Sequence, residues 1–505
     1  MREVRVRFAP SPTGPLHIGG VRTALYNYLF AKQNKGKFIL RIEDTDQTRF
    51  VEGAEQYINE SFDWLGIPFD ESPEKGGKYA PYKQSERREI YVKYAQQLID
   101  NGFAYYAFDT PEQLNELRSD FEKKGETFQY GINTRASLYN SLNMSEAQLK
   151  ETIDSGVPYV IRVKIPENIT VNFNDLIRGD ISVDSNQLDD KVLFKSDGLP
   201  TYHLANIVDD YLMQISHVIR GEEWLPSAPL HVLLYEFLGI KEVMPQFAHL
   251  PLILKPNGTG KLSKRDGDRL GFPVFPLQWT DPETKDVSSG YREAGYLPQA
   301  VINMLALLGW NPGTEQEIFS LEELIEIFSI DRISKSGAQF DPAKAKWFNH
   351  NHLVLLPPEK LAELLYPFLR ENNIYATPEY VRNVCELIAD RLTLIPDLWE
   401  QSKFFFVEPE EFNQKAIKKH WKSDTNTLLN LYVDVLNNVD KFDKDNLHEI
   451  TKKFVEENNI GFGQIMNPLR ILIVGDSFGP GMMDIMQAIG KQAVISRIKK
   501  GLEKI

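Results

Sequence analysis

The sequence predicts an α/β N-terminal half built on a parallel sheet, interrupted by an α+β insertion and followed by an all-helical C-terminal half. Three observations support this fold class. Strand-like and helix-like segments alternate over the first hundred residues, the pattern changes between about 108 and 190, and beyond 320 only helical spacing remains. The chain of 505 residues has room for about three to five domains of roughly 100–200 residues each.

A strand, a turn, a helix and a second strand open the chain. Residues 4–8 alternate as in a short strand, which ends in the Pro- and Gly-rich turn 9–15. Apolar residues recur at helical spacing over 18–29, and 38–42 form a buried strand followed by the acidic segment 43–46. This order predicts a βαβ unit and hence a parallel sheet.

The pattern changes in the insertion and then returns. Thr110-Pro111 predicts the start of a helix, and residues 159–165 alternate like a half-exposed strand. Strand-like segments follow at 192–194 and 217–220, with a helix after Pro229. Beyond residue 320 we expect no strands, because apolar residues recur every three or four positions. The clearest helical segments are 321–328, 361–369, 380–392 and 427–436.

The composition excludes several classes of protein. Hydrophobic residues make up 42%, as in globular proteins, and no apolar run approaches the roughly 18 residues of a membrane span. The net charge of −14 excludes a uniformly basic nucleic-acid coat but not a local basic groove. The single cysteine, Cys385, forms neither an intramolecular disulfide nor a cysteine-based zinc site. The segment Met1–Arg5 lacks a signal-peptide core, so we expect a cytoplasmic protein with no membrane partner.

The first motif that points to chemistry is Pro15-Leu-His17-Ile-Gly19-Gly20, at the turn from the first strand into the first helix. Ligands of open α/β sheets bind at the carboxyl ends of strands, and a helix N-terminus there offers free N–H groups to a phosphate. Gly19 and Gly20 would let the backbone approach a nucleotide, and His17 would donate to a phosphate oxygen. The alternative is that His17 only caps the helix and the glycines shape the turn.

The second motif is Gly258-Thr-Gly260-Lys261-Leu-Ser263-Lys264-Arg265. Its glycines predict a mobile loop, and its cations suit the triphosphate of a nucleotide. A lysine on such a loop can stabilise the charge that develops on a leaving pyrophosphate. The alternative is a solvated basic surface loop.

Together, these motifs resemble the two signature motifs of class I aminoacyl-tRNA synthetases. Longer blocks narrow the resemblance to bacterial-type glutamyl-tRNA synthetases, and they cover essentially the whole chain. The blocks are residues 7–20, 40–46, 199–206, 218–224 and 261–265, with further similarity at 308–313, 340–342 and 479–481. The resemblance implies a Rossmann-like catalytic domain. It also implies a two-step reaction, in which glutamate and ATP give glutamyl-adenylate and pyrophosphate, and the amino acid then passes to the 3′ end of tRNA-Glu with release of AMP.

The resemblance also implies roles for individual residues. The glutamate pocket would be formed by Arg7, Ser11, Glu43, Tyr202, Asn206 and Arg220. ATP would be bound by Ala9, His17, Gly19, Gly20, Glu223, Trp224, Leu252 and Lys264. The catalytic groups would be His17, Lys261 and Lys264. Without the resemblance, a structural ion pair explains Arg7 or Arg220 more readily, and a place in the core explains Trp224.

The same resemblance assigns the domains. Residues 1–107 and 191–255 would be the two halves of the catalytic domain, and 108–190 an insertion that binds the acceptor end of tRNA. Residues 256–345 would hold the lysine loop and contact the tRNA stem, and 346–505 would form the helical anticodon-binding region.

The sequence departs from the family pattern at three places. Gly20 ends the first motif, where glycine or another small residue is common in this branch. Many relatives carry a cysteine zinc cluster in the insertion, but here its positions read Tyr105-Tyr-Ala107-Phe-Asp109 with no cysteine near Tyr130, so we expect no zinc and no metal-binding residues. Residues 266–289 are longer than usual and rich in Pro and aromatics. They would pack on the lysine loop, touch the tRNA stem, or form an ordered surface excursion.

The expected ligands are ATP with Mg²⁺, glutamate and tRNA-Glu, and the expected state is a monomer. Basic clusters in the helical half would contact the tRNA, or else lie on solvated helix faces. These are Lys415, Lys418, Lys419 and Lys422, and Lys491, Arg497, Lys499 and Lys500. A tRNA-modifying paralogue lacks the helical half, and a eukaryotic-type glutaminyl-tRNA synthetase uses β-barrels there. A nucleotidylyltransferase would not need the helical half, and a non-catalytic tRNA-binding module would not keep both phosphate motifs.

Overall fold

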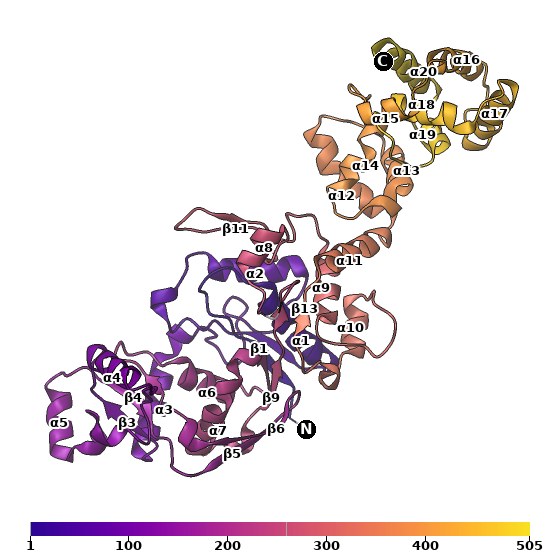
Figure 1. Cartoon of the computed structure of the whole chain (residues 1–505). Helices are drawn as coiled ribbons and strands as arrows, with labels where there is room; N and C mark the ends of the chain where they lie inside the picture. Colours follow the sequence, from indigo (N-terminus) through magenta and orange to yellow (C-terminus); the bar gives the residue numbers. More distant parts are fainter. Residues whose placement is uncertain (1, 259) are drawn as a thin grey trace. The chain divides into compact units, whose positions relative to one another are not determined.

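The computed structural model of the chain describes residues 2–258 and 260–505. The chain forms two compact units (Figure 1). The N-terminal unit comprises residues 1–294 and 301–342, and the helical unit comprises residues 295–300 and 343–505. Within the described residues, no helix combines the length and the apolar character that crossing a membrane requires.

The N-terminal unit opens with the predicted βαβ unit. β1 (Arg5–Phe8) and β2 (Lys37–Leu40) pair in parallel, and α1 (Ile18–Gln33) connects them. All four residues of β1 are buried, as expected for a parallel strand that is covered on both faces. The prediction from the alternation of residues 4–8 and the helical spacing that follows is confirmed.

A four-stranded sheet in the order β6-β5-β9-β8 continues the unit. Its strands are β5 (Thr170–Asp175), β6 (Gly179–Asp184), β8 (His217–Gly221) and β9 (Gln246–Leu250). β5 and β8 run parallel to β9, whereas β6 is antiparallel to β5. The β5–β6 hairpin falls within the range 108–190 expected for the insertion, yet Asp175 of β5 pairs with Phe247 of β9. The Ser216 N–H donates to the Arg5 carbonyl at 2.8 Å, which ties the start of β8 to β1.

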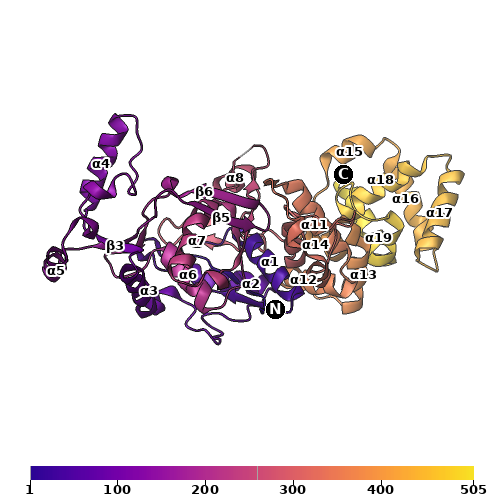
Figure 2. The same cartoon turned by 90° about the horizontal axis from the view of Figure 1, so that it is seen from below.

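A three-stranded antiparallel sheet is formed by β3 (Ala104–Ala107), β4 (Val160–Val163) and β7 (Val192–Phe194). Only β4 lies inside the range 108–190 predicted for the insertion, and β3 and β7 lie just outside its two ends. α4 (Pro111–Lys123) and α5 (Glu146–Asp154) flank the sheet and lie on the side of the unit away from α1 (Figure 2). Each helix begins with a capping box, formed by Thr110 with Gln113 and by Ser145 with Gln148. The helix start predicted from Thr110-Pro111 is confirmed.

Paired polar groups surround Tyr105 and Tyr130, at the positions where the family resemblance would place a cysteine zinc cluster. Tyr105 donates to the buried Asp190 carboxylate at 2.7 Å, and Arg135 donates to the same oxygen at 3.3 Å. Tyr130 donates to Asp109 at 2.8 Å, and the Arg162 guanidinium carbon lies 3.7 Å from the Tyr130 ring centre. The described residues contain no group of three or more His, Cys, Asp or Glu side chains that could hold a metal. The residues present therefore do not fit a zinc ion.

The N-terminal unit contains further helices and short strands besides these three sheets. The helices are α2 (Ala54–Leu65), α3 (Arg88–Asp100), α6 (Tyr202–Leu212), α7 (Ala228–Phe237), α8 (Lys264–Leu270), α9 (Pro298–Leu307) and α10 (Leu321–Ile327). The short strands are β10 (Ile253–Leu254), β11 (Trp279–Thr280), β12 (Val287–Ser288) and β13 (Ala338–Gln339). β13 pairs in parallel with β10, so the expectation of no strand beyond 320 is wrong. Two residues are too few to show an alternation in the sequence.

The segment after the lysine loop packs against the first helix. The Ile18 N–H, at the start of α1, donates to the Val274 carbonyl at 2.9 Å. The Phe275 and His17 rings meet edge to face at 6.0 Å between centroids. Trp279 packs in the same way against Tyr57 of α2, at 5.3 Å. Residues 274–279 are therefore anchored beside the first motif, whereas residues 283–286, between β11 and β12, are exposed.

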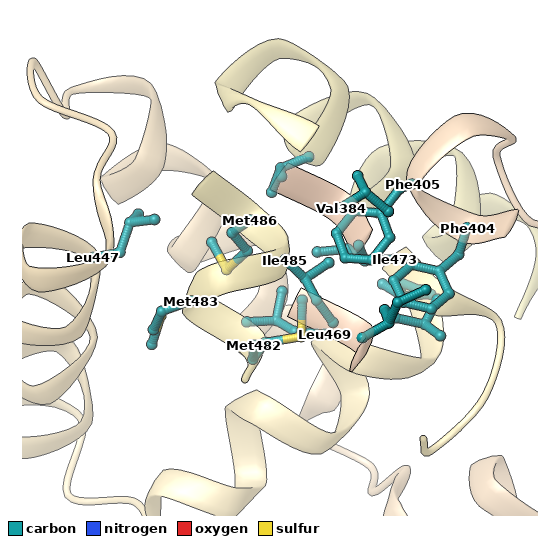
Figure 3. Close-up of a cluster of buried hydrophobic side chains, with 14 of the residues drawn as sticks. Val384, Phe404, Phe405, Leu447, Leu469, Ile473, Met482, Met483, Ile485 and Met486 are labelled. Carbon is teal, nitrogen blue, oxygen red and sulfur yellow. The ribbon is translucent and has the colours of Figure 1, made fainter. Parts of the chain in front are cut away.

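The helical unit has no strand among the residues described from 343 to 505. Its helices are α11 (Pro342–Val354), α12 (Pro358–Glu371), α13 (Pro378–Ile388), α14 (Asp397–Phe406), α15 (Gln414–His420), α16 (Thr425–Asn437), α17 (Lys444–Glu457), α18 (Phe462–Val474), α19 (Met482–Ile489) and α20 (Lys491–Lys504). Figure 3 shows part of their common core, where Met482 and Met486 lie close to Ile485 and Leu469. Cys385 is buried in this core, and burial raises the pKa of its thiol to about 12, as expected for an inert thiol.

Candidate active site

A cavity of about 880 Å³ lies in the N-terminal unit, where the chain leaves β1, β2 and β8 and enters α1. All the residues predicted for glutamate, ATP and catalysis line it except Lys264. They are Arg7, Ala9, Ser11, His17, Gly19, Gly20, Glu43, Tyr202, Asn206, Arg220, Glu223, Trp224, Leu252 and Lys261. The two motifs and the blocks between them therefore converge on one site.

His17 is both the N-terminal cap of α1 and a wall of the cavity. Its Nδ1 accepts the Gly19 N–H at 3.1 Å, so in the neutral ring the proton lies on Nε2. That Nε2 atom is buried and has no hydrogen-bond partner among the described residues. Burial, and next the charge of Lys261, lower the pKa of His17 to about 4. The side chain thus caps the helix, and its Nε2–H is left without a partner within residues 2–258 and 260–505; donation of this N–H to a phosphate stays a prediction.

The lysine loop places Lys261 in the cavity. Its Nζ forms an ion pair with Glu223 Oε1 at 2.8 Å. Burial, the largest single contribution, would raise the pKa of Glu223, but the hydrogen bond and charge of Lys261, together with the Glu223 backbone N–H and the charge of Arg22, lower it overall. Thr259 of the same motif lies outside the described residues. The loop is a wall of the cavity and not a remote basic surface.

Lys264 lies outside the cavity, at the first position of α8. At the start of this helix the Asp266 carboxylate accepts the Ser263 N–H at 3.0 Å and the Ser263 Oγ–H at 2.6 Å. Lys264 is close enough to the turn at Asp281 to affect the Asp281 carboxyl. The N–H groups of Thr284 and Glu283, and to a smaller extent the Lys264 charge, lower the pKa of Asp281. The role of Lys264 on the phosphates stays a prediction, and it requires the loop to move.

Beneath the cavity, buried arginines and carboxylates form one network. Arg7 binds Asp210 through two bonds, from Nε at 3.1 Å and from Nη2 at 3.2 Å. Arg41 donates to the same carboxylate at 2.7 Å and to Glu43 at 2.9 Å, and Asn206 donates to Glu43 at 3.2 Å. Burial alone would raise the pKa of Asp210, but Arg7 and Arg41 lower it. The structural ion pair considered for Arg7 is therefore present, and Arg7 lines the cavity as well.

Sequence reasoning missed the deeper members of this network. Arg41 is fully buried, and its neighbour Asp209 accepts from Arg87 at 2.7 Å and from Tyr91 at 2.8 Å. The signal was a charged residue inside the apolar strand 38–42 and a pair of acids in the apolar helix α6. Such residues are rarely buried unless they are paired.

Arg220 has a different environment. Its Nη1 donates to the Tyr202 hydroxyl at 2.7 Å and lies 3.3 Å from His231 Nδ1, and its Nε donates to His249 Nε2 at 3.0 Å. No carboxylate in the described part of the chain forms an ion pair with this guanidinium. Trp224 stacks at a tilt on Tyr202, 4.2 Å between ring centroids, and is 40% exposed, so it is a wall of the site and not a core residue. The corner presents a positive charge that an anionic ligand can neutralise.

Comparison with known proteins accounts for this arrangement. Residues 3–347 match the family described as tRNA synthetases class I (E and Q), catalytic domain, and residues 360–502 match the anticodon binding domain family. The chain belongs to the class I tRNA synthetase family. An aminoacyl-tRNA ligase of this class joins an amino acid to tRNA, and both halves of this chain correspond to its parts.

The similar proteins of this synthetase family match over nearly the whole length. The chain is 56% identical over 503 residues to the glutamate–tRNA ligase of Phocaeicola vulgatus, with 99% of each chain covered. It is 54% identical over 504 residues to that of Flavobacterium johnsoniae, with 100% of each covered. A crystal structure of a glutamate tRNA ligase from Elizabethkingia meningosepticum, in complex with its amino acid, matches with a TM-score of 0.96 and 51% identity over 99% of each chain. The α/β half with a parallel sheet and the helical C-terminal half are shared with these proteins.

Proposed function

We propose that this protein is a glutamate–tRNA ligase, which forms glutamyl-adenylate from glutamate and ATP and transfers the glutamyl group to the 3′ end of tRNA-Glu. The observation that carries the proposal is that the Arg220 guanidinium, which forms no ion pair with the described residues, lies in the same cavity as His17, whose Nε2–H has no partner among them. One feature suits a carboxylate and the other a phosphate. The names of the full-length relatives support the choice of glutamate.

In the first step, an oxygen of the glutamate α-carboxylate attacks the α-phosphorus of ATP. A carboxylate–phosphorus bond forms, and the bond to the bridging oxygen breaks as pyrophosphate leaves with its electron pair. The protein contributes position and charge stabilisation, because this chemistry needs little proton transfer. His17 Nε2–H and Lys261 stabilise the phosphate oxygens, and for Lys261 this means exchanging its ion pair with Glu223 for the phosphates.

In the second step, a hydroxyl of the terminal ribose of tRNA attacks the glutamyl carbonyl carbon. The new ester bond forms as the carbonyl–phosphate bond breaks, AMP leaves, and the hydroxyl proton passes to a phosphate oxygen of AMP or to water. Arg220, with Tyr202 on its Nη1, binds a carboxylate of glutamate. Arg7, Glu43 and Asn206 also line the cavity.

Lys264 acts only if the lysine loop closes on ATP. The Lys264→Ala variant should lower kcat for tRNA-dependent adenylate formation by about 10²–10³, the scale for losing one charge-stabilising donor. The KM for glutamate should hardly change, since Lys264 is remote from Arg220. Steady-state kinetics test this, and a kcat within about twofold of wild type would exclude Lys264 from the mechanism.

The proposal extends to the other ligands and the state of the protein. ATP acts with Mg²⁺, which is held mainly by the phosphates, and no zinc takes part. The insertion binds the acceptor end, residues 256–345 approach the stem, and the helical unit binds the anticodon of a monomeric, cytoplasmic enzyme. The α15 cluster supports the anticodon role, because Lys415, Lys418, Lys419 and Lys422 are all exposed. The α20 cluster supports it less, because Arg497 is buried and donates to the carbonyls of Phe404 and Ile473.

The decisive experiment is the charging of purified tRNA with each amino acid in turn. We expect ATP-dependent formation of glutamyl-tRNA with tRNA-Glu and no product with glutamine. Charging with glutamine instead would replace the proposal by a glutaminyl-tRNA synthetase. The same assay with tRNA-Gln as acceptor establishes whether the enzyme discriminates between the two tRNAs.

A further inference from the structure

Behind Arg220 lies a buried histidine that contacts it on one side and an aspartate on the other. His249 of β9 is fully buried, and its Nε2 accepts the Arg220 Nε–H at 3.0 Å. Its Nδ1 lies 2.6 Å from Asp175 Oδ2. Asp175 ends β5, on the hairpin that joins the sheet through β9. The chain thus connects three neighbouring strands, and only Arg220 of the three residues lines the cavity.

The hydrogen bonds leave one arrangement of protons on this histidine. A guanidinium only donates, so Nε2 must be an unprotonated acceptor. The Asp175 carboxylate already accepts the N–H groups of Ile177 at 3.0 Å and Arg178 at 2.9 Å, so it is an acceptor toward Nδ1 as well. Nδ1 therefore carries the proton, and Asp175 fixes the tautomer.

We propose that Asp175 and His249 are positioning residues that hold the Arg220 guanidinium in the orientation that binds the carboxylate of glutamate. This inference rests on the proposed function. His249 occupies the Nε side of the guanidinium, and Tyr202 and His231 contact Nη1. A neutral ring between Arg220 and Asp175 fixes the orientation without placing a carboxylate against the guanidinium. A carboxylate in direct contact, as Asp210 is for Arg7, would compete with the ligand.

Asp175→Asn tests the role of the tautomer. The N–H groups of Ile177 and Arg178 both donate to Asp175 Oδ1 and favour the amide oxygen at that position, which turns the amide NH₂ toward His249 Nδ1. The ring then carries its proton on Nε2, where it opposes the Arg220 Nε–H. We expect the Kd for glutamate, measured by calorimetry, to rise at least about tenfold, the scale of one hydrogen bond to a charged group. The Kd for ATP should stay within about twofold.

A double-mutant cycle separates positioning from a general structural role. In His249→Gln, the amide oxygen can still accept from Arg220 and no tautomer remains to be fixed. Asp175→Asn should then weaken glutamate binding by less than about threefold in the His249→Gln background. Asp190→Asn is the matched control, because Asp190 is equally buried and bonded to Tyr105 but lies in the insertion. It should leave glutamate binding unchanged.

The outcomes distinguish the two proposals. If the wild-type enzyme neither binds glutamate nor charges tRNA with it, the proposed function fails. If wild type binds glutamate, three results would show that the positioning role is wrong. Asp175→Asn could bind glutamate as well as wild type does, or it could lose affinity for ATP and glutamate alike. It could also lose as much glutamate affinity in the His249→Gln background as in the wild-type background. If Asp175→Asn does not fold, His249→Gln and His249→Leu provide the test. His249→Gln should retain glutamate affinity to within about threefold, and His249→Leu should lose at least about tenfold. Equal glutamate affinities in the two variants would overturn the inference.

Discussion

The Arg7 corner and the Arg220 corner of the cavity hold the same side chain by opposite means. Arg7 is bound through two hydrogen bonds by Asp210, which also binds Arg41. Arg220 is held by a tyrosine and two imidazoles, with its nearest carboxylate partner one ring away. The first corner is electrostatically complete without a ligand, and the second is not. Burying an uncompensated charge is unfavourable, so binding an anion at Arg220 gains energy that binding at Arg7 does not.

The largest effect should come from breaking the complete corner. Asp210→Asn leaves the buried Arg7 and Arg41 without their shared counterion and should lower the free energy of unfolding by about 3–5 kcal/mol. Denaturant titration measures this loss. Asp70→Asn is the control, because its ion pair with Lys32 is partly exposed and should contribute at most about 1 kcal/mol. Equal losses in the two variants would show that the network under the cavity is not special.

Removing the charge at the other corner should affect binding and not folding. Arg220→Met should lower kcat/KM for glutamate by about 10²–10³, the range for truncating a desolvated charge partner. The thermal midpoint of the ligand-free enzyme should not fall, because no carboxylate is left without its partner. Kinetics and a thermal melt check both parts. A fall in stability as large as that of Asp210→Asn would remove the distinction between the corners.

Acid should affect the Arg220 corner at a higher pH than the Arg7 corner. Burial lowers the pKa of His203, whose Nδ1 contacts His231, to about 4, whereas the unfolded value is near 6.5. Unfolded chains therefore bind a proton first, and stability falls as pH drops from about 6.5 toward 4. The pKa of Asp210 is lowered, so this carboxylate becomes protonated, and its ion pairs are lost, only at a pH below the usual range for an aspartate.

His203→Asn should therefore reduce the fall in unfolding free energy between pH 7.5 and 5 by about 2 kcal/mol. Denaturant titrations at the two pH values measure it. Substitution of the exposed His448 by Asn should leave that fall unchanged. An unaltered fall in His203→Asn would show that this histidine is not held neutral by the fold.

The smallest effect should come from treating the enzyme with a chelator. The relevant feature is a third buried charge, the Asp190 carboxylate. The Asp190 carboxylate is satisfied by Tyr105, by Arg135 and by the Ile165 N–H at 2.9 Å. We expect a chelator-washed enzyme to contain no stoichiometric zinc and to charge tRNA within about twofold of untreated enzyme. Loss of activity together with release of one zinc would contradict this.

The sequence could predict what depends on local chemistry. The βαβ unit follows from the alternation in residues 4–8 and the spacing over 18–29, and α4 begins where Thr110 allows a capping box. The motifs also indicated which residues would meet in the cavity. The partners of the two arginines could not be predicted, because Asp210 lies 203 positions from Arg7 and Asp175 lies 74 from His249. Their pairing is set by strand order and by the β5–β6 hairpin, and neither leaves a periodic pattern.

The neutral partners of Arg220 also have a consequence for how the binding pocket can evolve. Replacing Arg7 would remove one of the two cations that bind Asp210, so a single substitution there destabilises the buried network beneath the cavity. Replacing Arg220 leaves the side chains of Tyr202, His231 and His249 to find new partners, and each can accept or donate a hydrogen bond. The Trp224 carbonyl, which accepts from Arg220 at 3.4 Å, also carries no charge. A change of amino-acid preference can therefore begin with a single substitution at this corner that leaves the protein folded. The corner proposed to bind the substrate carboxylate is thus the one that can change with the least effect on the fold.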